Sequence, residues 1–498
     1  METKGPEANW IARNTMMTMR KLLILMILAT FCSNCQTQPG ALTLTGGAVP
    51  PVGNNPGTGR TTSSSESTSG SQTTPSALAL LDGTVVDAQN QKPVRAATIF
   101  HNGVAVRTGT DGKFELKEAD TSKLVLIKAS GYRQTSVSLT DSRTLKVALK
   151  PFDAKGLYLT HFGVSSKMLR NRVLGLIDET DLNAVVIDVK GDRGLLSSRY
   201  NIPLAAEIGA LRLPTIKDAR AFVADLHQRN IYAIARIVVF KDNILANAKP
   251  EWAITDTRTQ KPWMDREELA WVDPFRKEVW EYNIAIAKEA AKAGFDEIQF
   301  DYMRFPTDGK LSSAKYSQPN NMENRVKTIN TFLETAAKEL LPYNVYFSGD
   351  IFGYTPWNYN DTDIGQKIEE VAKHLDYLCL MVYPSGYHLG IPGYRNPVQH
   401  SREVVYYTLE KAAKRLDGQS KKLRPWLQNF RDYAFDRRPY NGNDIKLQIQ
   451  ACDQARSSGY LLWDPSNKFT HTADAMKALR PGADQVAGQV VSKPQVAQ

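Results

Sequence analysis

The sequence contains few cysteines, and their positions do not match a zinc site or a redox centre. Only four occur in 498 residues, at Cys32, Cys35, Cys379 and Cys452. Cys32 and Cys35 adjoin an apolar run, which is a poor setting for a redox motif, and histidine partners at zinc-ligand spacing are missing. Cys379 falls in an apolar strand pattern and Cys452 in a helical pattern, so we expect both to be buried thiols. The sequence therefore predicts no metal ion and no organic cofactor.

The positive charge of the chain is modest and scattered. The formal net charge is +10, and the Lys and Arg residues do not form a stripe interleaved with aromatic side chains. Proteins that bind single-stranded nucleic acids combine a positive groove with aromatic stacking surfaces. We therefore expect no nucleic-acid partner.

The N-terminal region has an apolar run that is too short to span a bilayer. Leu22–Phe31 (LLILMILATF) follows Arg20 and Lys21. About ten apolar residues cannot cross a membrane, whereas basic residues before a short apolar core are typical of a secretory signal. Translation from Met16, Met17 or Met19 would give a signal of more usual length than translation from Met1.

Cys35 is a candidate lipidation site. It follows Phe31-Cys32-Ser33-Asn34 and resembles the lipidated cysteine of a bacterial lipoprotein with a relaxed lipobox. A plain cleaved signal or an uncleaved anchor is the alternative. We predict that residues 1–35 direct export, and that any membrane contact is made by this segment alone. The expected location is the cell envelope, either lipid-anchored or periplasmic, or the secreted fraction.

Two segments have almost nothing to bury. Residues 36–76 are rich in Gly, Ser, Thr, Pro and Asn, and residues 481–498 are polar without periodicity. Such compositions cannot offset the entropy cost of ordering the chain. We predict a disordered tether and a disordered tail, with no catalytic residue before about Ala77.

Residues 77–151 predict a small all-β sandwich. Short alternating runs are separated by Asn102-Gly103 and Asp111-Gly112, which are hairpin turn dipeptides. Four motifs resemble the carboxypeptidase regulatory-like family, a transthyretin-like sandwich: Gly83–Asp87, Lys92–Val94, Asp111–Phe114 and Ala129–Tyr132. The resemblance implies a spacer or an adhesion accessory, with a glycan-binding surface as the alternative.

Residues 155–480 alternate between strand and helix patterns, which predicts a (β/α)8 TIM-type barrel. Amphipathic helices are expected over 166–179, 216–228, 274–293 and 321–341. Eight strand-like runs can be counted, at 156–160, 184–190, 231–240, 297–303, 345–351, 375–383, 423–430 and 459–463.

The fourth of these strands alternates in an unusual way. Ile298, Phe300 and Tyr302 are apolar or aromatic, while the intervening residues are Glu297, Gln299 and Asp301. Since helices cover the outside of a parallel barrel, the polar side must face its interior or mouth.

The same alternation in the other strands predicts a converging polar set at the carboxyl ends of the strands. Aromatic side chains and a histidine accompany it, and flat rings stack on sugar faces. The candidate residues are Asp188, Lys190, Arg236, Gln299, Asp301, Arg304, Ser348, Asp350, Trp357, Tyr383, His388, Trp426, Gln428 and Trp463.

Long motifs in this region resemble a bacterial family of proposed glycoside hydrolases with a barrel catalytic domain. The motifs are Gly156–Thr160, Leu182–Lys190, Phe295–Pro306, Asp361–Gln366, Met381–Ser385 and Arg424–Gln428. The resemblance covers nearly the whole predicted barrel. It implies a carbohydrate substrate and a glycosidase-like architecture.

The carboxylates have competing interpretations. Asp301 is the candidate nucleophile or base, and the alternative is a structural ion pair with Arg236 or Lys190. Asp350 is the candidate general acid, and the alternative is a helix cap or loop hydrogen bond. Asp188 could replace either one, but an internal ion pair with Lys190 is favoured for it. The remaining candidates are expected to contact the substrate.

Three functions remain open from the sequence. The leading hypothesis is an exported glycoside hydrolase that cleaves a poly- or oligosaccharide by acid/base carboxylate chemistry. The alternative is a catalytically inert carbohydrate-binding or envelope-structural protein. A metal-dependent hydrolase or deacetylase is a third hypothesis, and activity that is unchanged in chelator would remove it.

Overall fold

The computed structural model describes residues 77–139 and 144–480. The predicted export segment (1–35, with Cys35), tether (36–76) and tail (481–498) lie outside the described residues. Within the described ranges, no helix has the length and apolar character needed to cross a bilayer.

The N-terminal part forms two small sheets around one apolar core. Alternate residues of β4, such as Phe114 and Leu116, are buried between exposed neighbours, so one face of the sheet packs inward. An all-β unit before the barrel is therefore confirmed, while its membership of the carboxypeptidase regulatory-like family stays a prediction. One sheet contains β4 (Lys113–Asp120), β1 (Ala77–Asp87) and β7 (Thr144–Leu149), and the other contains β3 (Val104–Arg107), β2 (Thr98–His101), β5 (Leu124–Lys128) and β6 (Thr135–Ser138).

The large domain is a closed parallel barrel, as the sequence predicted. Around the barrel the strands run β10-β12-β14-β15-β16-β17-β8-β9, and β9 pairs with β10 to close it. All eight predicted strands are present, although the seventh is only three residues long. Their bounds are β8 (Ala154–Leu159), β9 (Ala184–Lys190), β10 (Tyr232–Val238), β12 (Glu297–Asp301), β14 (Tyr346–Phe352), β15 (Tyr377–Met381), β16 (Trp426–Gln428) and β17 (Gly459–Trp463).

Helices surround the barrel and begin at side-chain caps where the sequence supplies them. Ser166, Asp218 and Asn321 cap α3, α5 and α8, and each accepts a backbone N–H of the first turn. A short β11 (Thr255–Asp256) and β13 (Ala314–Lys315) pair in the loops. The helices are α2 (His161–Ser165), α3 (Lys167–Glu179), α4 (Pro203–Glu207), α5 (Ala219–Gln228), α6 (Asn243–Ala248), α7 (Lys277–Lys292), α8 (Met322–Leu340), α9 (Ile368–Val371), α10 (Ser401–Arg415), α11 (Gly442–Gln454) and α12 (Thr472–Leu479).

The alternation predicted for β12 is confirmed. Phe300 packs outward on Phe332 of α8, with ring centroids 5.4 Å apart. Its neighbours Glu297, Gln299 and Asp301 bond to side chains of other barrel strands. The polar side of β12 therefore lines the barrel interior and ends at its mouth.

The alternation predicted for β9 is wrong after Asp188. Asp188 pairs in register with Arg236, but the next pair is Lys190 with Ile237, because the register shifts at this point. Such a bulge reverses the side on which later side chains point. Lys190 therefore lies away from Asp188, fully buried, and donates to Asp242 and Asn283 at 2.7 Å each. The predicted Asp188–Lys190 ion pair does not form.

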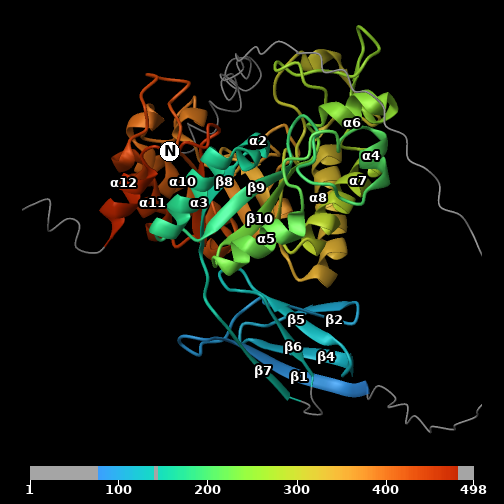
Figure 1. Ribbon diagram of the computed structural model, residues 1–498, viewed down its shortest axis with the longest axis vertical. Coiled ribbons are helices and arrows are strands. Elements are labelled where there is room, and N and C mark those ends of the chain that lie inside the picture. Colours follow the sequence, from blue (N-terminus) through green and yellow to red (C-terminus); the bar gives the residue numbers. More distant parts are fainter. Residues whose placement is uncertain (1–76, 140–143, 481–498) are drawn as a thin grey trace, which may run out of the picture.

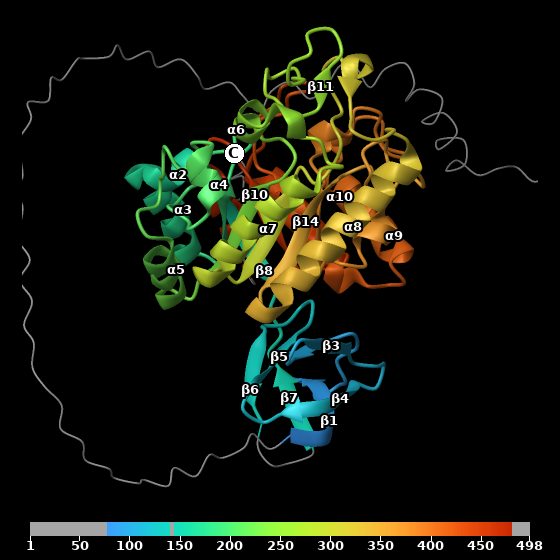
Figure 2. The same cartoon turned by 90° about the vertical axis from the view of Figure 1, so that its right-hand side faces the viewer.

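The small sheets lie against one end of the barrel. Figures 1 and 2 show β1–β7 below it, opposite the end that carries α6 and β11. The contacts involve Tyr346 and Tyr377, the first residues of β14 and β15. The Tyr346 hydroxyl donates to the carbonyls of Ala129 and Tyr132, at 2.9 and 2.7 Å. The Tyr377 hydroxyl accepts a hydrogen bond from the Gly131 amide. The sheets thus cover the amino-terminal end of the strands and leave the carboxyl-terminal end, where barrel enzymes keep their active sites, to the loops.

The Tyr346 hydroxyl should hold the two units together. Tyr346→Phe leaves two carbonyl oxygens without this donor, so we expect a loss of about 1–2 kcal/mol in the free energy of unfolding. Chemical denaturation would measure the loss, and limited proteolysis would report separation of the sheets from the barrel. Tyr460→Phe is the matched control, because the Tyr460 hydroxyl is buried inside the barrel domain and donates its hydrogen bond to the Met476 sulfur of the same domain, at 3.6 Å. Equal effects of the two substitutions would contradict a role in docking.

Candidate active site

Arg236 occupies the centre of the polar set at the carboxyl end of the barrel. Its guanidinium, on β10, donates to Asp188 of β9 and Asp301 of β12, and it lies 3.8 Å from Asp350 of β14. All four side chains are at least nine-tenths buried. The structure thus brings together Arg236 and the three carboxylates that the sequence analysis expected to converge there.

Asp301 is surrounded by donors. Arg236 Nε and Nη2 reach its Oδ2 at 3.1 and 2.5 Å, and the Tyr302 amide donates to its Oδ1 at 2.6 Å. Three N–H donors stabilise a carboxylate rather than a carboxylic acid. Tyr302 has φ of +51°, a left-handed conformation that is rare for an aromatic residue and costs of order 1–3 kcal/mol. This strain lies directly beside Asp301.

Asp350 is in the opposite electrostatic situation. Its side chain is 1% exposed, and its clearest donor is Trp426 Nε1, at 2.8 Å from Oδ1. Burial raises the pKa of Asp350 well above its usual range, and the neighbouring charge of Asp301 raises it further. The Arg236 guanidinium is shared among three buried carboxyl groups, so full ionisation would leave uncompensated negative charge. This arrangement favours the protonated form of Asp350.

Asp301 and Asp350 lie on the same edge of the Arg236 guanidinium. Their Oδ2 atoms lie 3.1 and 3.8 Å from the same Nε atom. Two neighbouring buried carboxyl groups do not readily ionise together, and the Asp301 carboxyl helps to raise the pKa of Asp350. The two groups therefore titrate as one pair.

Asp188 lies across the guanidinium from that pair. It accepts from Arg236 Nη1, from the Tyr158 hydroxyl at 2.5 Å, and from the His161 amide at 3.3 Å. Burial raises the pKa of Asp188, although Arg236 and Tyr158 oppose the shift. Asp188 is therefore a second, separately held carboxylate at the mouth.

Aromatic rings flank the carboxyl groups. Tyr158 stacks on Trp463 with centroids 3.9 Å apart, and Arg236 lies over both rings. Trp426 meets Trp463 edge-on at 5.2 Å and is fully buried. Sequence reasoning missed Tyr158, although alternation along β8 places it on the same side as Gly156 and would have found it.

Two residues that were predicted to bind substrate, Gln428 and Gln299, form hydrogen bonds with other residues of the protein instead. Gln428 accepts from the Ser385 amide at 3.0 Å and donates to the Ser385 hydroxyl at 2.7 Å. Gln299 donates to Cys379 Sγ at 3.1 Å below the carboxyl groups, and its Oε1 and the neighbouring Ser348 Oγ are buried with no partner among the described residues. Gln428 positions a loop, and Gln299 and Ser348 fill the layer beneath the site.

The other predicted contacts lie farther from the carboxyl groups. Arg304 is buried beside Trp271 and Tyr302, with its guanidinium 5.3 and 4.9 Å from their ring centroids. Trp357 belongs to a separate apolar cluster and donates to Thr408 at 3.0 Å. His388 is exposed, with its ring 5.8 Å from that of Tyr354 in the same cluster. The structure brings neither Trp357 nor His388 to the three aspartates.

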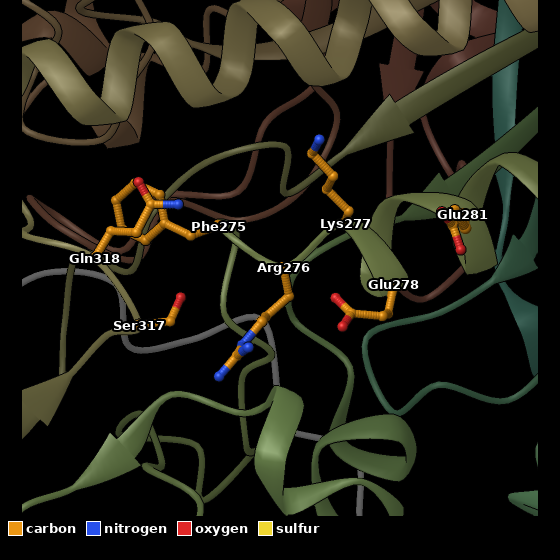
Figure 3. Close-up of a pocket in the computed structure, with 7 residues that line it drawn as sticks. All are labelled: Phe275, Arg276, Lys277, Glu278, Glu281, Ser317 and Gln318. Carbon is orange, nitrogen blue, oxygen red and sulfur yellow. The ribbon is translucent and has the colours of Figure 1, made fainter.

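A hollow of about 520 Å³ lies at the start of α7 (Figure 3). Its lining residues come from the segment before α7, its first turns and the segment after β13, namely Phe275, Arg276, Lys277, Glu278, Glu281, Ser317 and Gln318. None of them belongs to the carboxylate cluster, so the hollow is a separate surface feature. Within the part of the chain that the structure describes, no group of three or more His, Cys, Asp or Glu side chains has the arrangement of a metal site.

The solved structures that match this chain include a hypothetical protein from Ruminiclostridium thermocellum ATCC 27405, with 38% identity over 39% of this chain and 96% of that one and a TM-score of 0.35. The PgaB (BpsB) glycoside hydrolase domain from Bordetella bronchiseptica is 17% identical over 68% of this chain and 98% of that one, with a TM-score of 0.45. A beta-galactosidase from Marinomonas ef1 is 10% identical over 68% and 60%, with a TM-score of 0.46.

The search of curated proteins returns no match. The family described as "Putative glycosyl hydrolase domain" matches residues 156–469, which include the whole barrel except the start of β8. This match covers more than half of the chain, and the protein therefore belongs to that glycosyl hydrolase family.

Proposed function

We propose that the protein is an exported glycoside hydrolase that cleaves a poly- or oligosaccharide, with Asp350 as the general acid. The observation that carries the proposal is the pair of buried carboxyl groups, Asp301 and Asp350, on one edge of Arg236 at the barrel mouth, next to the aromatic rings. A buried carboxyl group that keeps its proton at neutral pH can donate it to a glycosidic oxygen. The signal-like segment Arg20–Phe31 supports export.

The hydrolysis would use the three aspartates in different roles. Asp350 donates its proton to the glycosidic oxygen as the bond from that oxygen to the anomeric carbon breaks. Asp188 removes a proton from the water that attacks the anomeric carbon, because its raised pKa makes it a stronger base than an ordinary carboxylate. The negative charge of Asp301 keeps the proton on Asp350 in the resting enzyme. After hydrolysis, the proton that Asp188 has taken up is transferred back to Asp350, and the charges of Asp301 and Arg236 again stabilise that resting state.

This assignment changes the role predicted for Asp301. The sequence suggested a nucleophile or base, but Asp301 lies beside the proposed acid at the same nitrogen of Arg236, and we assign it to the acid's side of the scissile bond. Asp188, held on the other terminal nitrogen of Arg236, is better placed for the second role.

The experiment incubates the full chain with a panel of soluble polysaccharides and their oligosaccharides and identifies the products by mass spectrometry. Hydrolysis is expected for the native protein and should fall at least about a hundredfold in Asp301→Asn and Asp188→Asn. Asp178→Asn is the matched control, because Asp178 is an exposed α3 residue paired with Arg229. Full activity of Asp301→Asn would sink the assignment.

A second candidate, an inert carbohydrate-binding protein, is favoured by one observation. Asp188 and Asp301 are both in buried ion pairs with Arg236, which can serve stability alone. Glycan binding that persists unchanged in Asp301→Asn, without any hydrolysis product, would support this candidate.

A further inference from the structure

A row of aromatic rings leads outward from the carboxyl pair. Tyr383 follows β15, the strand whose Cys379 pairs with Asp350, and it continues the inward side of that strand. The Tyr383 and Phe430 ring centroids are 5.4 Å apart, and Phe430 and Tyr433 are nearly parallel, at 7° and 6.1 Å. All three rings are half-buried, so each keeps part of its surface open to solvent.

The beginning of this row lies at the end of the strand that neighbours the proposed acid. β14 and β15 pair in parallel, with Asp350 opposite Cys379 and Phe352 opposite Met381, and Tyr383 comes two residues after the last pair. The row therefore starts at the barrel mouth next to β14 and follows the loops after β15 and β16.

A buried hydrogen-bond network holds these two loops together. Ser385, in the loop after Tyr383, donates its hydroxyl to Asp432 at 2.7 Å and receives the Gln428 amide at 2.7 Å. Asp432 also accepts the backbone amides of Ala434, Phe435 and Arg437. Although burial raises the pKa of Asp432, these hydrogen bonds outweigh it and keep the pKa below its usual range. A charged anchor thus fixes the loop that carries Phe430 and Tyr433.

Rings held in this way suit sugar units better than they suit core packing. A core ring is enclosed, as Trp426 is, whereas Tyr383, Phe430 and Tyr433 are rigidly placed yet partly open. Aromatic side chains offer large, flat contact area at a low entropic cost, and the hydroxyls of tyrosines supply hydrogen bonds. The chemistry fits the apolar faces and hydroxyl edges of successive pyranose rings.

We propose that Tyr383, Phe430 and Tyr433 form a glycan-binding track, a row of subsites that binds an extended chain on one side of the scissile bond. The proposal rests on the proposed function for its ligand class, and it deepens that function by specifying a linear chain of several sugars. Gln428 and Asp432 are positioning residues for the track.

The track predicts a dependence on chain length. In Tyr433→Ala, kcat/KM for the longest oligosaccharide that the native protein cleaves should fall roughly three- to tenfold, while kcat/KM for the nitrophenyl glycoside of the same sugar should stay within about twofold. Tyr433→Phe should retain the native ratio, because it keeps the ring. Tyr407→Ala is the control for removing a solvent-exposed tyrosine, since Tyr407 lies on the outer helix α10.

A binding measurement separates the track from the proposed hydrolysis. Affinity electrophoresis in gels containing glycol chitin, hydroxyethyl cellulose, laminarin or galactan needs no turnover. Weaker retention of Tyr433→Ala than of Tyr433→Phe would support the track even if no polysaccharide were cleaved. An unchanged chain-length ratio with unchanged retention, equal losses on both substrates, or no retention of the native protein together with no cleavage would overturn it.

Discussion

Asp350→Asn is expected to lower kcat by roughly two to four orders of magnitude, because the substitution removes the proton donor but keeps the side-chain shape. The loss should depend on the leaving group. A glycoside with dinitrophenolate as leaving group needs little protonation, so its kcat should fall far less than that of an oligosaccharide. Steady-state kinetics on the two substrates measures the difference. An equal loss on both would show that Asp350 does not act as the acid.

The pH dependence of the same variant gives a second, independent readout. The folded-state pKa of Asp350 is raised above the ordinary value of about 3.9. Ionisation of Asp350 is therefore harder in the folded protein than in the unfolded chain, and this lowers the free energy of unfolding. Its cost to stability is absent below pH 4 and grows as the pH rises from there through the raised folded value. Asp350→Asn removes this cost, so the variant should gain stability over the native protein at neutral pH and gain little at pH 4. Chemical denaturation at the two pH values tests this, and a gain of equal size at both would contradict a raised pKa.

Asp301→Asn should affect activity by a different route. Burial raises the pKa of Asp350, and the charge of Asp301 raises it further, so removing that charge takes away part of the shift. Asp350 then loses its proton at lower pH, and the alkaline limb of the pH–activity profile should move toward acid. An alkaline limb that stays in place would contradict this role for Asp301.

Most of the fold could be predicted from the strand pattern, because the two sides of each strand face different environments. Phe300 faces α8 and Asp301 faces Arg236, and the sequence shows that alternation directly. Parallel neighbouring strands end at the same edge, so the meeting of Asp188, Arg236, Asp301 and Asp350 followed from counting residues.

Three features could not be obtained in this way. The bulge after Asp188 reverses the direction of Lys190, and nothing in the local sequence marks where a register shift will fall. The roles of the aspartates depend on which side chain receives the guanidinium nitrogens of Arg236, and that is a matter of rotamers rather than of position. Tyr433 and Phe430 were missed because their loop has no periodicity, and Asp432 ties this loop to Ser385, which is distant in sequence.

Arg424→Met is expected to cost about 3–5 kcal/mol in the free energy of unfolding, the largest stability effect that this structure predicts. Arg424 and Glu297 form an ion pair at the amino-terminal end of the barrel interior, and both side chains are 0% exposed. Arg424 also lies 3.6 Å from the centre of the Tyr377 ring and donates to the Ser458 carbonyl. Among the described residues, its removal leaves the Glu297 charge with only the Tyr232 hydroxyl, at 3.0 Å, as a partner.

The pair can be tested by removing both charges, with unfolding monitored in denaturant. Glu297→Leu with Arg424→Met should recover most of the loss, because the cost of the single substitution comes from the unpaired charge rather than from the missing contact. Lys338→Met is the matched control, since Lys338 pairs with Glu334 on the surface at 70% and 45% exposure and should cost at most about 0.5 kcal/mol. If Arg424→Met lowered the free energy of unfolding by no more than this control does, water would have to replace Arg424 as the hydrogen-bond donor to Glu297. The orphaned Glu297 Oε1 and Arg424 Nη2 would then mark a hydrated barrel floor rather than a dry ion pair.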